Sequence, residues 1–146
     1  MENSNSSVEK PKKIKLDFKD SKYATGRRKR SIAKVWVKKG SGNIYVNGLK
    51  MNEYFKRPVH QIIVTRPLEI TNVASNYDVK CSVTGGGLSG QAGAIILGIS
   101  KALISHDENL KKSLKKDKLT TRDSRVVERK KYGHRKARRS FQFSKR

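Results

Sequence analysis

The stretch that decides the fold is residues 79–104, VKCSVTGGGLSGQAGAIILGISKALI. Its first six residues alternate apolar with polar side chains, which is the period of a β-strand with one buried face. Gly85–Gly87 then interrupt the pattern, and residues 89–104 are rich in alanine, isoleucine and leucine. We therefore expect a strand, a tight turn and the most buried helix of the protein. The packing stripe of this helix is Ile95, Ile99, Ala102 and Leu103.

Ahead of this stretch, the sequence predicts two more strands. Residues 33–38 alternate in the same way and indicate a half-buried strand. Glycines at 40 and 42 can turn the chain, so that residues 44–46 return as the second arm of a hairpin, which Asn47-Gly48 ends.

The remaining apolar spacing is helical. Residues 51–55 and 59–63 predict two short amphipathic helices, and Pro67 is placed to begin a third. Asp107 is suited to cap a further, lysine-rich helix, after which the globular part ends near Leu119. The order of elements predicts an α+β domain, a small sheet with helices packed on one face.

The chain divides into three parts by composition. Residues 1–22 form a polar N-terminal extension, residues 23–119 the globular domain, and residues 120–146 an extended basic C-terminal tail. The tail has too little apolar area to offset the entropy of ordering it alone. The N-terminal extension has no apolar core of a signal peptide, and its four acidic residues are atypical of a transit peptide. We therefore expect a bacterial cytoplasmic location, with a mitochondrial or plastid location as the alternative.

Charge gives the first indication of function. The 146 residues carry 35 Lys and Arg against 12 Asp and Glu, a net charge of +23, and only 34% are hydrophobic. Residues 110–146 alone hold sixteen basic and three acidic side chains. Such a chain is expected to bind a polyanion, with nucleic acid the first candidate and an anionic membrane the second. Uninterrupted apolar runs such as residues 94–97 are far shorter than the roughly 20 residues of a membrane span, so none is expected.

No catalytic, cofactor or metal motif is complete. Residues 85–90 match G-x-G-x-x-G with Asp107 downstream, but a dinucleotide site needs a further parallel strand to carry that acid. Gln91 breaks both a P-loop and a nucleophile elbow. The three histidines lack metal-ligand spacing, and Cys81 fits a small core residue. A tight turn explains the glycines, and its amides at a helix N-terminus leave open a phosphate contact.

Two basic motifs remain. The first is Arg27, Arg28, Lys29 and Arg30, which precede the strand at 33–38 and are expected to contact phosphate at one edge of the sheet. The second is the tail, where Tyr132, His134, Phe141 and Phe143 interleave planar groups that can stack on bases. The basic residues of the tail expected to bind RNA are Arg122, Arg125, Arg129, Lys130, Lys131, Arg135, Lys136, Arg138 and Arg139.

Other polyanions would share this charge. A DNA-packing tail fits it, whereas a membrane-binding segment should also show an amphipathic apolar face or a lipidation signal. A free-standing nucleic-acid chaperone or DNA-binding protein is therefore the alternative to a protein of a larger RNA assembly.

Four motifs in order resemble those of one family. They are YATGRRK at residues 23–29, GGGLSGQAGA at 85–94, TRD at 121–123, and VERKK through KARR to FSKR at 127–146. Together they resemble the ninth protein of the small ribosomal subunit, of the bacterial and organellar type. Residues 1–22 extend beyond this resemblance.

The resemblance implies a structural role in translation. It implies an α+β fold of the ribosomal protein five domain-two-like kind, held on ribosomal RNA among other proteins of the small-subunit head. It also implies that the tail reaches the anticodon stem-loop of the peptidyl-site transfer RNA, with Ser144, Lys145 and Arg146 as the contact. No enzyme activity, cofactor, metal, membrane or small-molecule substrate is implied.

Overall fold

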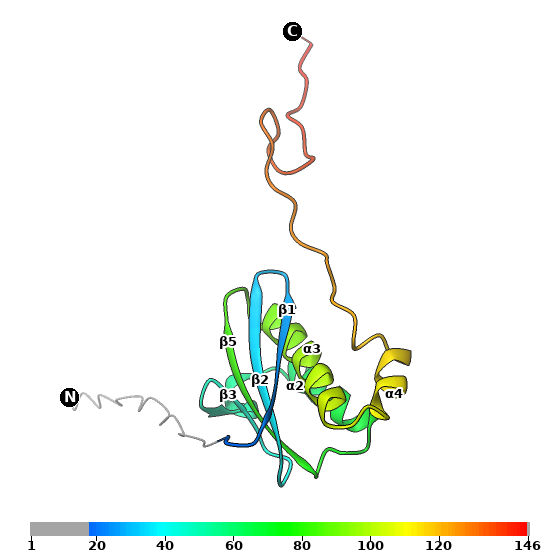
Figure 1. Cartoon of the computed structure of the whole chain (residues 1–146). Helices are drawn as coiled ribbons and strands as arrows, with labels where there is room; N and C mark the ends of the chain where they lie inside the picture. The colour runs from blue at the N-terminus through cyan, green and yellow to red at the C-terminus, as the bar shows by residue number, and fades with distance from the viewer. Residues whose placement is uncertain (1–17, 146) are drawn as a thin grey trace, which may run out of the picture.

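The structure is a computed structural model that describes residues 18–145. The chain forms five strands and four helices over these residues (Figure 1). In chain order they are β1 (Lys22–Arg28), β2 (Ser31–Lys39), β3 (Ile44–Val46), β4 (Leu49–Lys50), α1 (Met51–Tyr54), α2 (Pro58–Ile70), β5 (Tyr77–Thr84), α3 (Leu88–His106) and α4 (Leu110–Lys116).

The strands form one mixed sheet in the order β1-β2-β5-β3-β4. β5 lies in its centre, antiparallel to β2 and parallel to β3. The predicted hairpin between residues 33–38 and 44–46 is therefore wrong, because β5 lies between these two strands. β3 instead pairs with β4 through a turn at Asn47 and Gly48, both of which have positive φ.

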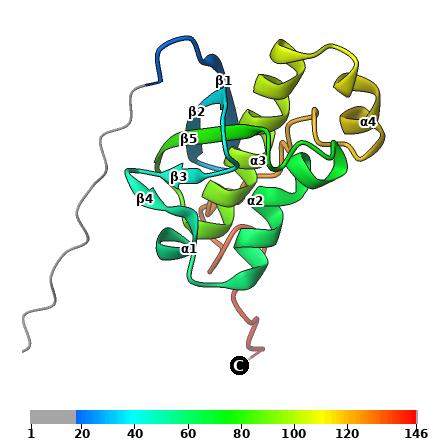
Figure 2. The same ribbon diagram turned by 90° about the horizontal axis from the view of Figure 1, so that it is seen from below.

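The helices cover one face of the sheet, as expected (Figures 1 and 2). α3 packs on β1, β2 and β5, and α2 and α4 pack beside it. The core lies between these layers, with Val35, Val79, Ile95 and Ile99 fully buried. The α+β fold class is confirmed.

By length and composition alone, α3 is long and apolar enough to cross a membrane. However, 61% of its most apolar 18-residue stretch is buried inside the domain. Its position against the sheet explains its composition. Cys81 is a buried core residue, and burial raises the pKa of its thiol.

Two helix boundaries differ from expectation. Pro67 lies inside α2 and begins no third helix, because Pro58 at the start of α2 opens a single helix of 13 residues. Asp107 does not cap α4: it ends α3, and its carboxylate accepts a hydrogen bond from the Tyr77 hydroxyl at 3.2 Å. Asn109 stands before α4 without a side-chain cap.

The edge strand β1 is an element that the apolar pattern does not predict. Its core-facing residues are Ala24 and Gly26, which are too small to mark a buried face in the sequence. A Cβ at Gly26 would lie 1.8 Å from the carbonyl oxygen of Ala94 and 2.6 Å from the amide nitrogen of Gly98. β1 thus rests directly on the backbone of α3, an approach that only glycine permits.

The chain beyond Leu119 leaves this core. Leu119 still packs against the core, whereas nearly all side chains from residue 121 to 145 are exposed. Figure 1 shows this segment running away from the domain, past the end of the sheet where β1 and β2 meet.

Candidate nucleic-acid interface

The four cations at 27–30 occupy the end of β1 and its turn into β2. Arg27 and Arg28 are the last residues of β1, a strand that precedes β2. Lys29 has a φ of 51°, which forms the turn, and Arg30 follows it. Alternation along β1 sends the neighbouring arginines to opposite faces of the sheet. Arg27 is exposed, and Arg28 is half-buried on the helix side.

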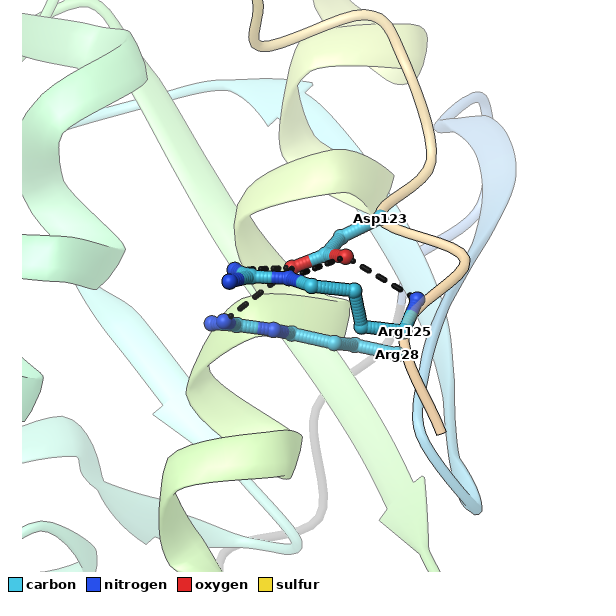
Figure 3. Close-up of polar contacts among 3 residues, drawn as sticks. All are labelled: Arg28, Asp123 and Arg125. Carbon is cyan, nitrogen blue, oxygen red and sulfur yellow. Dashed lines mark hydrogen bonds and ion pairs between the residues drawn. The ribbon is translucent and has the colours of Figure 1, made fainter. Parts of the chain in front are cut away.

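Arg28 joins the start of the tail through Asp123. Its guanidinium lies 3.3 Å from the Asp123 carboxylate, and both side chains are 31% exposed. Arg125 donates to the same carboxylate from Nη2 at 2.8 Å and from Nε at 3.0 Å. Figure 3 shows Asp123 with the two arginine side chains running side by side across α3. We call these three residues the tail clasp.

The tail clasp keeps its carboxylate charged. Hydrogen bonds from the side chain and backbone of Arg125, with the positive charges of Arg125 and Arg28, hold the pKa of Asp123 well below its usual range. The same contact raises the pKa of Arg125. Asp123 is one of two acidic residues in the tail. Its ion pair with Arg28 links the start of the tail to β1.

Gly93 makes room for the clasp. A Cβ at this position of α3 would lie 2.2 Å from Cδ of Arg28 and 2.8 Å from its Nη1. The Arg28 side chain therefore crosses α3 over a residue without a side chain. This is a packing reason for the glycine in the GQAGA segment.

The clasp brings the two predicted basic motifs to one end of the domain. A cavity of about 610 Å³ lies there between the β1–β2 turn, the glycine turn and the tail. Its lining residues are Lys29, Arg30, Gly86, Gly87 and Val126–Arg129. Three cations from two segments, Lys29 and Arg30 of the turn and Arg129 of the tail, thus face one space. Such a cluster suits an RNA phosphate better than an isolated surface lysine does.

Farther along, the tail folds back on itself. Glu128 pairs with Lys131 at 2.6 Å and with Arg138 at 3.0 Å, and these contacts lower the pKa of Glu128. An isolated bridge between His134 and Ser140 closes the loop. Within residues 18–145, the basic tail residues that form no ion pair are Arg122, Arg129, Lys130, Arg135, Lys136, Arg139 and Lys145.

Phe141 and the chain end complete the tail. The guanidinium carbon of Arg135 lies 5.2 Å from the centroid of the Phe141 ring, so this aromatic group already stacks on a cation. Ser144 and Lys145 are exposed. Arg146, the third residue expected at the transfer RNA contact, lies outside the described residues.

The glycine turn is structural. Gly85 and Gly86 have positive φ, and the buried Ser31 donates its hydroxyl to the carbonyl of Gly85. α3 is followed by α4 and not by a parallel strand, and Asp107 is held at the opposite end of α3, so the dinucleotide motif is incomplete in three dimensions. These features confirm the tight turn expected between strand and helix.

Among the described residues, the histidines are not arranged as a catalytic triad or as a cluster of metal ligands. His60 Nε2 lies 3.2 Å from the Ser89 hydroxyl, but its Nδ1 is buried with no partner among the described residues. A nucleophilic serine needs an oriented base, and no acid orients this ring in the part of the chain described. Across residues 18–145, no three His, Cys, Asp or Glu side chains gather as metal ligands do.

Sequence reasoning missed Asp123 and Gly93 as parts of the interface. Arg28 was expected to contact RNA directly, yet the structure gives it an acidic partner 95 positions later. The only sequence signal was the isolated acid of the TRD segment at the start of a basic tail, which by itself names no partner.

Comparison with known families agrees with the motifs. The family described as Ribosomal protein S9/S16 matches residues 26–146, from the β1 glycine to the end of the tail. The match covers both basic motifs, the tail clasp and every helix of the domain. The chain belongs to the ribosomal protein S9/S16 family and is a structural, RNA-binding constituent of the small ribosomal subunit.

Proposed function

We propose that the chain holds ribosomal RNA of the small-subunit head and contacts the peptidyl-site transfer RNA with its last residues. The RNA-binding residues in this proposal are Arg27–Arg30 and nine basic residues of the tail. These nine are Arg122, Arg125, Arg129, Lys130, Lys131, Arg135, Lys136, Arg138 and Arg139. Ser144, Lys145 and Arg146 form the transfer RNA contact. The ribosome is proposed to be bacterial, because residues 1–22 carry four acidic residues and no arginine, a composition atypical of a transit peptide.

The observation that carries the proposal is the meeting of the two basic motifs at one end of the domain. The β1–β2 turn and residues 126–129 face the same cavity, and the tail continues outward from it. A folded domain fixed on RNA at this end would direct the tail into the surrounding RNA. Twenty-seven residues after Leu119 can reach at most about 97 Å when fully extended.

The mechanism is electrostatic and geometric. Cations offset the repulsion between crowded phosphates, and phosphate contacts position the protein without reading sequence. Specificity is then expected to come mainly from RNA shape. Other proteins of the head are the expected neighbours.

Deletion of residues 144–146 tests the division between domain and tail end. The truncated protein should assemble into small subunits as the full chain does, because Ser144 and Lys145 are exposed and lie far along the chain from the core, which ends near Leu119. Affinity of those subunits for peptidyl-site transfer RNA should fall roughly tenfold, since a charge-assisted hydrogen bond contributes about 1.5 kcal/mol or more. Filter binding of transfer RNA to purified subunits measures this.

The matched control replaces Lys111 and Lys112 with glutamine, which removes two exposed charges from α4. This variant should leave transfer RNA affinity unchanged. Failure of the truncated protein to assemble, or equal transfer RNA affinity of the truncated and full-length subunits, would contradict the proposal.

Sedimentation addresses the alternative of a free-standing nucleic-acid chaperone or DNA-binding protein. The protein should co-migrate with the small subunit after treatment with deoxyribonuclease. Migration with DNA or as free protein would favour the alternative.

A further inference from the structure

The sheet face opposite the helices carries aromatic and basic side chains that neither basic motif explains. Tyr23, Trp36 and Lys80 lie in one row across β1, β2 and β5, because Tyr23 pairs with Trp36 and Trp36 with Lys80. Alternation places this row opposite the buried Val35 and Val37. We call these three residues and Phe18 the aromatic row.

The side chains of the aromatic row contact one another. The Tyr23 and Trp36 ring centroids are 5.3 Å apart at an angle of 45°. The Lys80 ammonium lies 5.8 Å from the Trp36 ring and 5.9 Å from the Phe18 ring. The segment before β1 thus brings a third ring to the group, and the row is a preformed arrangement of rings around one cation.

Among residues 18–145, this face carries exposed side chains. The Tyr23 side chain is 49% exposed, so part of its ring is accessible to a partner. Figures 1 and 2 show α2 and α3 on the other side of the sheet, and no described helix covers this side.

The charge around the aromatic row indicates the chemistry of the partner. Lys34 and Lys38 are exposed on the same face of β2. Asp78, the acid opposite Lys38, is held by the loop after β2, since its carboxylate accepts hydrogen bonds from the amides of Ser41 and Asn43. Over the residues that the structure describes, this face of the sheet therefore presents the rings of Tyr23 and Trp36 flanked by the ammonium groups of Lys34 and Lys38.

Rings and cations together favour single-stranded RNA. Contact with phosphates alone would need only the lysines. Duplex RNA offers few base faces to the rings. Unpaired bases can stack on aromatic rings while lysines contact the RNA backbone. An acidic protein segment would use the cations but leave the rings without partners. Sheet faces with exposed aromatic groups bind RNA in this way in other folds.

We propose that the aromatic row binds an unpaired stretch of RNA, with bases stacked on Tyr23 and Trp36 and the backbone along Lys34 and Lys38. This deepens the proposed function by adding a base-stacking contact to its phosphate contacts. It lies on a different face of the domain from the tail clasp.

Trp36 makes the test direct, because it is the single tryptophan of the chain. The full-length protein is titrated with a twelve-nucleotide oligoadenylate and with an RNA hairpin of equal phosphate number. The oligoadenylate should quench Trp36 fluorescence more strongly than the hairpin does. Tyr23→Ala should weaken oligoadenylate binding at least about fivefold, the low end for loss of one stacked base.

Three variants separate stacking from other effects. Tyr23→Phe keeps the ring and should bind within about twofold of the original protein. Tyr132→Ala removes a tail ring that is 96% exposed and should weaken oligoadenylate binding less than Tyr23→Ala does. Deleting residues 144–146 should preserve the stronger quenching of Trp36 by oligoadenylate than by the hairpin, so this inference and the proposed transfer RNA contact can fail separately.

The inference is wrong if the hairpin quenches Trp36 as strongly as the oligoadenylate, or if Tyr23→Ala binds as the original does. It is also wrong if Tyr132→Ala weakens oligoadenylate binding as much as Tyr23→Ala does or more, which would place binding on the tail. Quenching by a polyglutamate peptide and not by oligoadenylate would identify an acidic protein segment as the occupant.

Discussion

Single glycines fix how close β1 and the tail come to α3. Gly26 allows backbone contact with α3, and Gly93 leaves space for the Arg28 side chain. Neither acts through a positive φ, so the requirement is space and not backbone conformation. The family motifs at 23–29 and 85–94 thus meet in space at these two residues.

Gly26→Ala should destabilise the domain by about 1–3 kcal/mol or more, because the added methyl group meets backbone atoms that cannot rotate away. Urea denaturation of the free protein measures the loss. Gly87→Ala is the matched control, since a Cβ there has nothing within 4 Å. It should change stability by less than about 0.5 kcal/mol. Equal stability of the two variants would show that β1 does not rest on α3 as described.

Among the elements, the tail is held to the domain by side chains and not by a strand or a helix. Arg125 and Asp123 are both tail residues, so the clasp depends on Arg28 for its connection to β1. The contact is half-exposed, and its effect on global stability is expected to be small. Its role is to set where the tail leaves the domain.

Arg28→Gln should release the start of the tail while leaving the fold intact. Trypsin cleavage after Arg125 should become severalfold faster, measured by mass spectrometry, and the melting temperature should stay unchanged. Arg27→Gln, which changes the exposed neighbouring arginine, is the control and should cleave like the original protein. Unchanged cleavage in Arg28→Gln would mean that the tail is held in another way.

The clasp also has a defined pH range. The pKa of Asp123 is lowered in the folded protein, so the contact is fully formed above the ordinary aspartate value of about 3.9. It is lost only as the pH falls through the lowered value. Release of the tail at mildly acidic pH is therefore not expected.

The elements that were predicted correctly are those with a strong apolar signal. β2, β5 and α3 bury whole rows of valine, isoleucine and leucine, so their period is visible in the sequence. β1 and the strand order were not predictable in this way. β1 buries alanine and glycine, and the parallel pairing of β3 with β5 depends on long-range packing that spacing does not encode.

At the scale of the whole molecule, the basic residues behind the net charge of +23 are not equally free to contact phosphate, because some of them already form ion pairs. Arg28 and Arg125 share Asp123, and Lys131 and Arg138 share Glu128. The sequence located the basic tail correctly but counted all its cations as equivalent. Only the folded arrangement separates cations that have an acidic partner from those that do not.

Salt dependence should reveal this difference. Each phosphate engaged contributes about 0.7–0.9 to the slope of log affinity against log salt, so the double variant Lys130→Gln, Lys136→Gln should reduce the slope for small-subunit RNA by about 1.4–1.8. The control, Arg125→Gln with Arg138→Gln, removes the same charge from paired positions and should reduce it less. Equal reductions, measured by titration from 50 to 200 mM salt as a working range, would contradict the distinction.

The central position of β5 has a consequence for how the protein is made. In the sheet, β5 lies between β2 and β3, although it follows both of them in the sequence. In addition, β1 needs α3 to cover its core face. During synthesis from the N-terminus, β1 and β2 emerge first but cannot complete a sheet until residues 77–106 have followed. The core then closes in a late, long-range step, and the basic tail emerges from the ribosome that makes it only after all the segments of the core have emerged.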